Sequence, residues 1–302
     1  MPAVQNPPNA PHTLNAWPGA AKVSAVMAEL NYLAPGVERP ASYTFEPPSG
    51  VPWSTGELAP EWVMVHDGRS LAALGELSLD RSGFAQLSHR SALTDFSDEA
   101  AIRSVYYPES EQLLRTATGA EKIVIFDHTL RDSARGSRDS RNLREPVRRV
   151  HNDQTFVSAP RRVRDHLPPP EAAQRLKHRF AIINLWRPLA TVEQLPLAMC
   201  DARSIAPGDL VPSDLIYPDK VGETYAFRYN REHRWYWFPR LRSDEPLLLK
   251  IYDSRDDGTA RLTAHSAFVH PDTAPEAPPR RSIELRALVF WPEDTAPGAS
   301  HR

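Results

Sequence analysis

Proline accounts for 30 of the 302 residues, against 13 glycines, and this ratio limits what the chain can fold into. Proline lacks a backbone N–H and has a fixed φ angle, so it is kept out of helix interiors and of central strands in sheets. We therefore expect short helices, many loops and many strand ends. We do not expect a coiled coil or a helical bundle.

The rest of the composition is that of an ordinary globular chain, with 41% hydrophobic residues and a formal net charge of −2. The single cysteine, Cys200, cannot form an internal disulfide, which indicates a reducing compartment. No apolar run approaches the roughly 18 residues that a bilayer span needs, and the first residues lack the pattern of a secretory signal. We expect a cytoplasmic protein without a membrane or nucleic-acid partner.

Two regions differ in composition. Residues 1–60 carry many prolines and few periodic apolar positions, so we expect a Pro-rich arm that lies on the surface or is partly disordered. Residues 61–302 are expected to form a single domain with a helical N-terminal part. The oligomeric state stays open, with a homodimer as one alternative.

Helices are expected in three places. The first begins at Ser97, has acidic residues in its first turn and is expected to stop at Pro108. The second runs from Glu109 to about Thr118 and is ended by Gly119. A short third helix is expected over 171–177.

The second half of the chain is a series of short runs rich in β-branched and aromatic residues, preceded by a similar run at 123–126. Turn signals such as those at 207–209 and 256–258 separate them. Many short strands about a dozen residues apart predict an antiparallel sandwich or barrel. The runs are RFAIINLW, LAMCDARSI, DLIY, ETYAFRYN, RWYWF, LLLKIYDS, ARLTAHSAF and RSIELRALVFW.

An arginine-rich segment lies between Arg131 and Arg149, with seven arginines and three acidic residues. One interpretation is an anion-binding patch or a loop that covers a substrate. The other is a solvated, mobile loop, and we favour this second interpretation.

A histidine and an aspartate two positions apart, His151 and Asp153, are candidates for a metal site. On an extended segment alternate side chains share a face, so both could bind one ion. With one remote histidine they would form the two-histidine, one-carboxylate set typical of non-haem Fe(II) oxygenases, which leaves three coordination positions open. The motif is short, and a surface turn is the alternative interpretation.

The remote histidine is expected to be His265. It shares a strand face with Arg261 and Thr263, and it is followed fifteen residues later by Arg280 in an R-x-S motif. An arginine fork and a nearby hydroxyl can together bind a carboxylate, as an enzyme that uses a 2-oxoacid requires. His233 is the alternative third ligand, but no such motif follows it at a useful distance.

These motifs resemble those of a known family, the Fe(II)- and 2-oxoglutarate-dependent oxygenases. Within it the chain is most similar to the hydroxylase/desaturase group, which includes a fungal gibberellin desaturase, an aspergillic-acid hydroxylase and a component of the cephamycin 7α-methoxylase. The resemblance covers about residues 120–292. It is carried by the segments VHNDQT, INLWRPL, YNREHRWYWFPR, LLLKIYDS, AHSAF and RRSIELRALVFW.

The resemblance implies a mainly β fold with a double-stranded β-helix, or jelly-roll, core and flanking helices. It also implies that Fe(II) is bound by His151, Asp153 and His265, and that 2-oxoglutarate and O2 are cosubstrates. The carboxylate anchor for 2-oxoglutarate would be Arg280 with Ser282. The alternatives for this anchor are Arg281, which stands where the group often has an acid, and Arg286, which shares the strand face of Arg280.

The substrate implied by the resemblance is a small natural-product-like molecule of secondary metabolism, which is hydroxylated, desaturated or otherwise oxidised at a C–H bond. The candidate pocket residues are Asn184, Trp186, Arg187 and Trp237. Two other functions fit a β-barrel with these histidines. One is a cupin-type metalloprotein that works without 2-oxoglutarate, and the other is a non-catalytic small-molecule-binding barrel.

Overall fold

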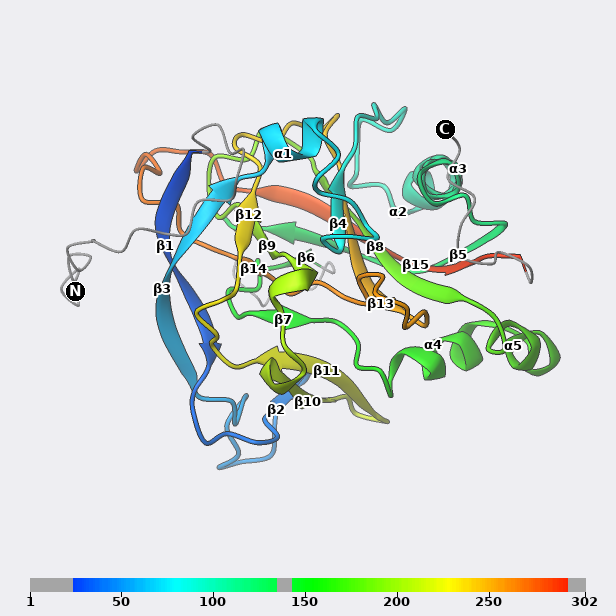
Figure 1. Cartoon of the computed structure of the whole chain (residues 1–302), viewed down its shortest axis with the longest axis horizontal. Helices are drawn as coiled ribbons and strands as arrows, with labels where there is room; N and C mark the ends of the chain where they lie inside the picture. The colour runs from blue at the N-terminus through cyan, green and yellow to red at the C-terminus, as the bar shows by residue number, and fades with distance from the viewer. Residues whose placement is uncertain (1–23, 135–142, 293–302) are drawn as a thin grey trace.

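The computed structural model describes residues 24–134 and 143–292, which form two facing β-sheets with helices packed around them (Figure 1). The strands of the described part are β1 (Ala25–Leu33), β2 (Ala41–Tyr43), β3 (Leu58–Asp67), β4 (Phe84–Gln86), β5 (Lys122–Asp132), β6 (Leu143–Arg144), β7 (His151–Asn152), β8 (Phe180–Pro188), β9 (Leu197–Cys200), β10 (Leu210–Ile216), β11 (Val221–Phe227), β12 (Trp235–Trp237), β13 (Leu247–Asp253), β14 (His265–Ala267) and β15 (Arg281–Phe290).

The helices of this part are short, as the proline content predicts. None of them is long and apolar enough to cross a membrane. They are α1 (Arg69–Ala73), α2 (Glu99–Ala101), a π-helical turn (Ile102–Tyr106), α3 (Tyr107–Thr118), α4 (Ala159–His166), α5 (Pro169–Arg175) and two 3-10 turns (Ala202–Ser204 and Pro207–Asp209). The short helix expected over 171–177 corresponds to α5.

The first sheet has six strands in the order β4-β13-β8-β15-β5-β6. Its central strands β8 and β15 are buried along almost their whole length, because both faces of the sheet are covered. One face, which includes Ile182, Trp186 and Leu288, packs toward the second sheet. The opposite face, with Ile183 and Leu185, packs against the helical segment 99–118. Alternation along each strand therefore fills two separate apolar layers.

The second sheet has nine strands in the order β1-β3-β12-β9-β14-β7-β11-β10-β2. It curls, because two bridges, Asn31–Arg149 and Leu33–Arg228, bring β1 back against the chain next to β7 and β11. The curl encloses an apolar cluster, here called the barrel cluster. It includes Leu30, Tyr32, Val65, Val150, Phe227, Trp235 and Ala264.

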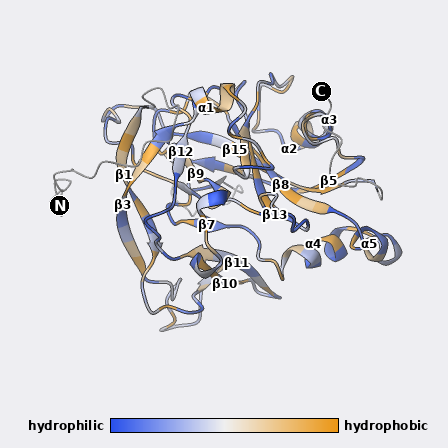
Figure 2. Ribbon diagram, viewed as in Figure 1, coloured by the Kyte–Doolittle hydropathy of each residue, from blue (hydrophilic) through white to orange (hydrophobic). Residues whose placement is uncertain are grey.

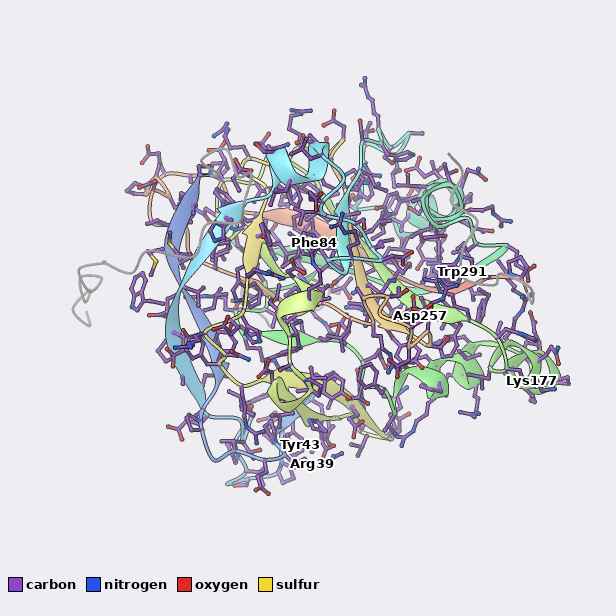
Figure 3. All side chains as sticks on the ribbon, in the orientation of Figure 1. Arg39, Tyr43, Phe84, Lys177, Asp257 and Trp291 are labelled. Carbon is purple, nitrogen blue, oxygen red and sulfur yellow. The ribbon has the colours of Figure 1, made fainter. Side chains whose placement is uncertain are left out.

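Apolar residues concentrate where this arrangement buries them. Figure 2 shows stretches of apolar colour on β1 and β8. Phe84, which is fully buried, lies in the interior in Figure 3, while Lys177 and Arg39 lie at the periphery. Each of the strand-like runs expected from the sequence contains an observed strand, so the predicted mainly β, jelly-roll class is confirmed.

The expectation that Pro108 ends a helix is wrong. The helical segment runs through it, over 99–118, and the N–H of Tyr107 bonds to the carbonyl of Ile102, five residues earlier. After this π-helical turn α3 begins at Tyr107, so Pro108 lies in the first turn of α3. Backbone N–H groups in a first turn have no partner within the helix, so the N–H that proline lacks costs no hydrogen bond. Gly119 ends the helix as expected, with a φ of 67°.

Part of the expected surface arm belongs to the fold. In β1, Leu30 and Tyr32 are fully buried, and the strand pairs along its whole length with β3. The expected boundary at residue 60 falls inside β3. The remainder of the proposed arm, residues 1–23, lies outside the described residues, as do 135–142 of the arginine-rich segment.

Candidate metal centre

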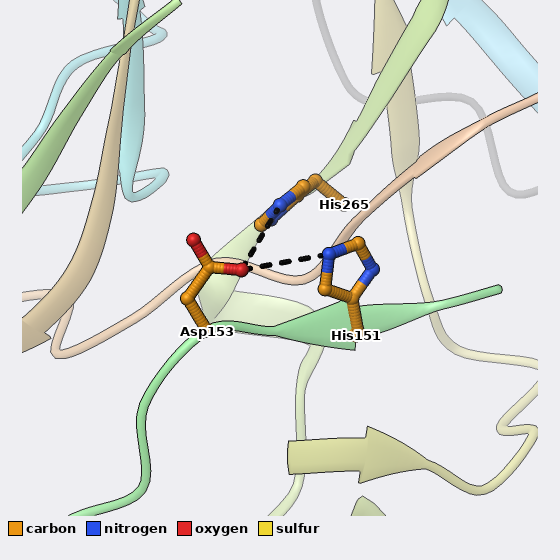
Figure 4. A group of neighbouring side chains, drawn as sticks. All are labelled: His151, Asp153 and His265. Atoms are coloured by element: carbon orange, nitrogen blue, oxygen red, sulfur yellow. Dashed lines mark ion pairs between the residues drawn. The ribbon is translucent and has the colours of Figure 1, made fainter. Parts of the chain in front are cut away.

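Three side chains able to hold a metal ion meet where β7 and β14 lie side by side. These strands are antiparallel, with His151 directly opposite His265. Asp153 follows β7, and its carboxylate points toward both imidazoles (Figure 4). One ligand atom from each residue lies within 4.8 Å of the others. The structure thus brings together the three residues that the sequence predicts as metal ligands.

The orientation of His151 leaves one ring nitrogen free for a metal. Its Nδ1 lies 2.8 Å from the carbonyl oxygen of Arg149, which can only accept, so Nδ1 carries the proton and donates. Nε2 then has a free lone pair and lies 3.5 Å from Asp153 Oδ1. The Nε2 atom of His265 lies 4.0 Å from the same oxygen. Both Nε2 atoms therefore converge on one carboxylate oxygen.

The environment keeps His151 and Asp153 in their metal-binding forms. Burial and the neighbouring His265 lower the pKa of His151 to about 3, although Asp153 opposes the shift. Burial by itself would raise the pKa of Asp153, but Arg286 and the two histidines outweigh it and hold that pKa well below its usual range. At neutral pH His151 is therefore neutral and Asp153 is ionised, as metal coordination requires.

The second oxygen of Asp153 is held by two donors. Asn184 donates from Nδ2 to Oδ2 at 2.8 Å, and Arg286 donates from Nε to the same oxygen at 3.0 Å. Asn184 lies on β8 and Arg286 on β15, opposite each other in the six-stranded sheet. These bonds fix the carboxylate so that Oδ1 faces the histidines. Hydrogen bonds to a metal-ligating carboxylate commonly orient it in this way.

A buried glutamate, Glu284, completes this charge network. Its carboxylate accepts hydrogen bonds from Asn184 at 3.0 Å and from Arg131 and Arg286, each at 3.2 Å. Arg286 also pairs with Asp127 at 3.0 Å. Arg286 is thus fully engaged with acidic side chains, which disfavours it as a free anchor for a ligand carboxylate.

Arg280 is in the opposite situation. Its side chain is buried, with the guanidinium 5.5 Å from the ring centroid of Trp186. Nη1 donates to the carbonyl of Leu195 at 2.5 Å, a residue with a left-handed φ of 44°. In the described part of the chain, neither Arg280 Nε nor the buried Ser282 Oγ has a hydrogen-bond partner. Burial, with Arg131 nearby, lowers the pKa of Arg280 to about 9.

Arg281, the other candidate anchor, points away from the site. Alternation along β15 puts it on the face opposite to Arg280 and Ser282, and its side chain is 58% exposed. Of the three arginines considered from the sequence, Arg280 alone combines burial with unused donors. A buried cation beside an unpaired hydroxyl is suited to bind the carboxylate of a diacid.

The donor set fits one class of metal. Two imidazole nitrogens and one carboxylate oxygen on one side of an ion form the facial triad of non-haem Fe(II) oxygenases. The unpaired donors of Arg280 and Ser282 fit the distal carboxylate of 2-oxoglutarate, since a buried donor without a partner is costly unless a ligand satisfies it.

Two of the expected pocket residues face away from this centre. Arg187 lies on the outer face of β8 and donates to Tyr106 and His89, so the expectation that it lines the pocket is wrong. Trp237 packs on Phe268 and His270, on the side of the barrel cluster, and the same expectation is wrong for it.

The faces follow from strand pairing. Tyr236 pairs with Met199, and Met199 pairs with His265, so these three share a face. Trp237, the neighbour of Tyr236, must point the other way. Trp186 does lie on the face of Asn184, beneath Arg280.

The alternative third ligand, His233, has a different role. Its Nδ1 pairs with the hydroxyl of Tyr32 at 2.9 Å, and its Nε2 pairs with Asp209 at 3.0 Å. It thus belongs to a buried network at the barrel cluster.

The sequence analysis did not predict Glu284, although an acidic residue at an inward position of an apolar strand was a usable signal. It also missed the carbonyl of Leu195, which has no sequence signature.

Known proteins resemble this chain over most of its length. The sequence matches the family described as "Oxidoreductase/YMDC permease-like domain" over residues 30–290. The hydroxylase/desaturase CTB9 of Cercospora beticola is 35% identical over 240 residues, which cover 72% of this chain and 74% of that protein. The alpha-ketoglutarate-dependent dioxygenase phiK of a fungal species is 33% identical over 290 residues, covering 93% of this chain and 100% of phiK.

Solved structures agree with these relatives. The iron and alpha-ketoglutarate-dependent endoperoxidase NvfI superposes with a TM-score of 0.79 at 29% identity, covering 90% of this chain and 99% of that chain. A relative of the same name, from Aspergillus novofumigatus, is 31% identical over 273 residues, which cover 87% of this chain and 96% of that protein. The likeness therefore spans both sheets and the candidate metal centre.

Proposed function

Since this chain belongs to the Fe(II)- and 2-oxoglutarate-dependent dioxygenases, the family of its hydroxylase/desaturase relatives, we propose that His151, Asp153 and His265 hold its iron. The observation that carries the proposal is the convergence of two Nε2 atoms and one carboxylate oxygen on one point between the sheets. Enzymes of this family use Fe(II), 2-oxoglutarate and O2 and act on small molecules. When bound, iron with its cosubstrates supplies the oxidation of a C–H bond.

Hydrogen bonds from neighbouring groups orient His151 and Asp153 for metal binding. The Arg149 carbonyl keeps the proton of His151 on Nδ1, so that Nε2 is free. Asn184 and Arg286 bind Asp153 Oδ2, which leaves Oδ1 as the single oxygen presented to the ion. A carboxylate held in this way would offer one oxygen to the ion.

Arg280 and Ser282 bind the distal carboxylate of 2-oxoglutarate in this proposal. Their unpaired donors support it, as does the lack of an acidic partner within 4.0 Å of Arg280 among the described residues. Trp186 lies beneath the guanidinium and limits its movement. The Arg280–Ser282 pair also favours an oxygenase over a cupin-type metalloprotein, which needs no carboxylate clamp.

The substrate is a small natural-product-like molecule of secondary metabolism, and the reaction is a hydroxylation, a desaturation or a related oxidation. The relatives support this range, since they are named hydroxylase/desaturase, dioxygenase and endoperoxidase.

Anaerobic titration with Fe(II) and 2-oxoglutarate tests the proposal, because the iron chelate of a 2-oxoacid has a weak visible charge-transfer band. We expect the band in the wild-type protein and its loss in His151→Ala and in His265→Ala. His270→Ala, a histidine outside the centre, is the matched control and should keep it. Mn(II) binding followed by electron paramagnetic resonance reports the same ligands without turnover. An unchanged band in His151→Ala, or no band in the wild-type protein, would falsify the proposal.

A further inference from the structure

Arg149 lies on the extended segment that carries His151 and Asp153, two positions before the first ligand. Val150, between Arg149 and His151, is 2% exposed and packs into the barrel cluster. Alternation therefore places the side chain of Arg149 on the face that carries His151. The hydrogen bond from His151 Nδ1 to the Arg149 carbonyl fixes the His151 ring against the backbone of Arg149. A guanidinium thus stands beside the metal centre.

This guanidinium has almost no partners. Arg149 is half-buried, and it donates from Nη1 to Ser42 Oγ at 3.0 Å. Within residues 24–134 and 143–292, no carboxylate oxygen lies within 4.0 Å of it. Arg286 and Arg131, the cations on the other side of the centre, are both paired with Glu284. Asp153 is the acid whose charge acts on Arg149, and its carboxylate is already held by Asn184 and Arg286.

The charges of the proposed site leave Arg149 unmatched. A 2-oxoglutarate dianion and Asp153 together carry the negative charge that balances Fe(II) and Arg280. The remaining acids near the centre, Glu284 and Asp127, are bound by Arg286. A partly desolvated cation is costly unless it is paired, so an anion supplied from outside would be stabilised at Arg149.

The surroundings of Arg149 have room for such an anion. It lines an open groove of about 480 Å³ together with Asn31, Leu58, Val147 and Arg148. This groove belongs to the nine-stranded sheet, whereas Arg280 and Ser282 belong to the six-stranded sheet. The two cations therefore stand on different sheets that flank the metal centre, one suited to the cosubstrate and the other to a second ligand.

A small buried apolar cluster lies next to the metal centre on the same face. Ala226 is the pairing partner of His151, and Val211 is the partner of Ala226. With Leu33 they form a small apolar cluster that is separate from the barrel cluster and from the two apolar layers of the six-stranded sheet. Cross-strand partners share a face of the sheet, so this cluster and His151 point the same way. In the groove itself, Leu58, which is 44% exposed, and Val147 offer apolar side chains to a carbon skeleton whose charged end reaches Arg149.

We propose that Arg149 binds the carboxylate of the primary substrate, which is a small organic acid with an apolar skeleton. The inference rests on the proposed function, because it assigns the face beside the iron to the substrate. Arg149 is then a specificity-determining residue. A neutral analogue of the substrate lacks the charge-assisted bond and is bound less tightly.

The test uses 1-naphthoate as an anionic apolar probe and 1-naphthylmethanol as its neutral counterpart. Both are titrated against the protein loaded with Mn(II) and 2-oxoglutarate, and binding is followed by probe fluorescence and by the relaxation of probe protons near Mn(II). We expect the wild-type protein to prefer naphthoate by about tenfold or more, with strong relaxation of its protons. Arg149→Met should abolish this preference and leave the affinity for 2-oxoglutarate unchanged. Arg231→Met, which changes an exposed arginine that does not line this groove, is the control and should behave as wild type.

The outcomes separate the inference from the proposed function. If Mn(II) and 2-oxoglutarate bind normally but naphthoate binds wild type and Arg149→Met equally, the inference is overturned alone. If Arg149→Met loses affinity for 2-oxoglutarate instead, Arg149 holds the cosubstrate, and both this inference and the assignment of Arg280 are overturned. If the wild-type protein does not bind Mn(II), the proposed function fails and the inference fails with it.

Discussion

Replacing Arg280 by methionine should separate cosubstrate binding from protein stability. In the structure the guanidinium has one protein acceptor, the Leu195 carbonyl, and its Nε has no partner in the described part. Removing one member of a buried charge pair typically costs about 2–5 kcal/mol. At about 1.4 kcal/mol for each factor of ten, 2-oxoglutarate should bind about 30-fold to several thousandfold more weakly.

In the protein without ligands, Arg280→Met should not reduce the free energy of unfolding. Burial lowers the pKa of Arg280 to about 9, which means that the fold disfavours its charged form. An apolar side chain of similar volume removes that cost, so Arg280→Met should have an unchanged or higher free energy of unfolding. Arg286→Met loses its ion pairs with Asp153 and Glu284 and should be destabilised by about 3–5 kcal/mol.

Anaerobic calorimetric titration of 2-oxoglutarate into the iron-loaded protein measures the first effect, and urea unfolding of the metal-free protein measures the second. Arg281→Met changes an exposed arginine on the opposite face and should alter neither quantity. The reasoning is refuted if Arg280→Met binds 2-oxoglutarate as tightly as wild type. It is refuted equally if the variant is strongly destabilised in the absence of ligands.

Three further outcomes are expected. Asn184→Leu removes a hydrogen-bond donor to Asp153 Oδ2 and should weaken Fe(II) binding about 10- to 100-fold. Competition with a chromophoric chelator measures this affinity, and an unchanged value would contradict the orienting role of Asn184. The metal-free protein should lose stability as the pH falls from about 6.5 toward 3, because in this window the unfolded chain protonates His151 and the fold does not. Urea unfolding should show a shallower fall in His151→Gln, and equal slopes would be inconsistent with the lowered pKa. Leu288→Ala empties a fully buried position between the sheets and should lower the free energy of unfolding by about 2–5 kcal/mol, so a loss below about 1 kcal/mol would argue against tight packing there.

Local patterns in the sequence were enough to predict the strands and the three side chains that meet at the candidate metal centre. Alternation predicted that His151 and Asp153 share a face, and the R-x-S motif pointed to His265 as the third ligand. Alternation could also have excluded Arg187, since Asn184 and Trp186 occupy the other face of β8. The error over Arg187 was therefore avoidable from the sequence.

Other features depend on contacts between distant segments, which local patterns do not carry. The face of Trp237 depends on the pairing of β12 with β9 and of β9 with β14. The Asn184 and Arg286 bonds to Asp153 require knowledge of how the two sheets face each other. The helix through Pro108 depends on a π-helical turn, which the residue types alone do not distinguish from a helix end.

The bridge between Asn31 and Arg149 has a consequence for how the protein is made. It joins positions more than a hundred residues apart, and the proposed metal ligands His151 and Asp153 are completed only by His265, which lies further along the chain. Contacts of such long range form late, because the entropy of closing large loops must be overcome first. A chain emerging from the ribosome thus holds no complete ligand set until most of it has been synthesised. Iron should consequently load onto the finished fold and take no part in nucleating it.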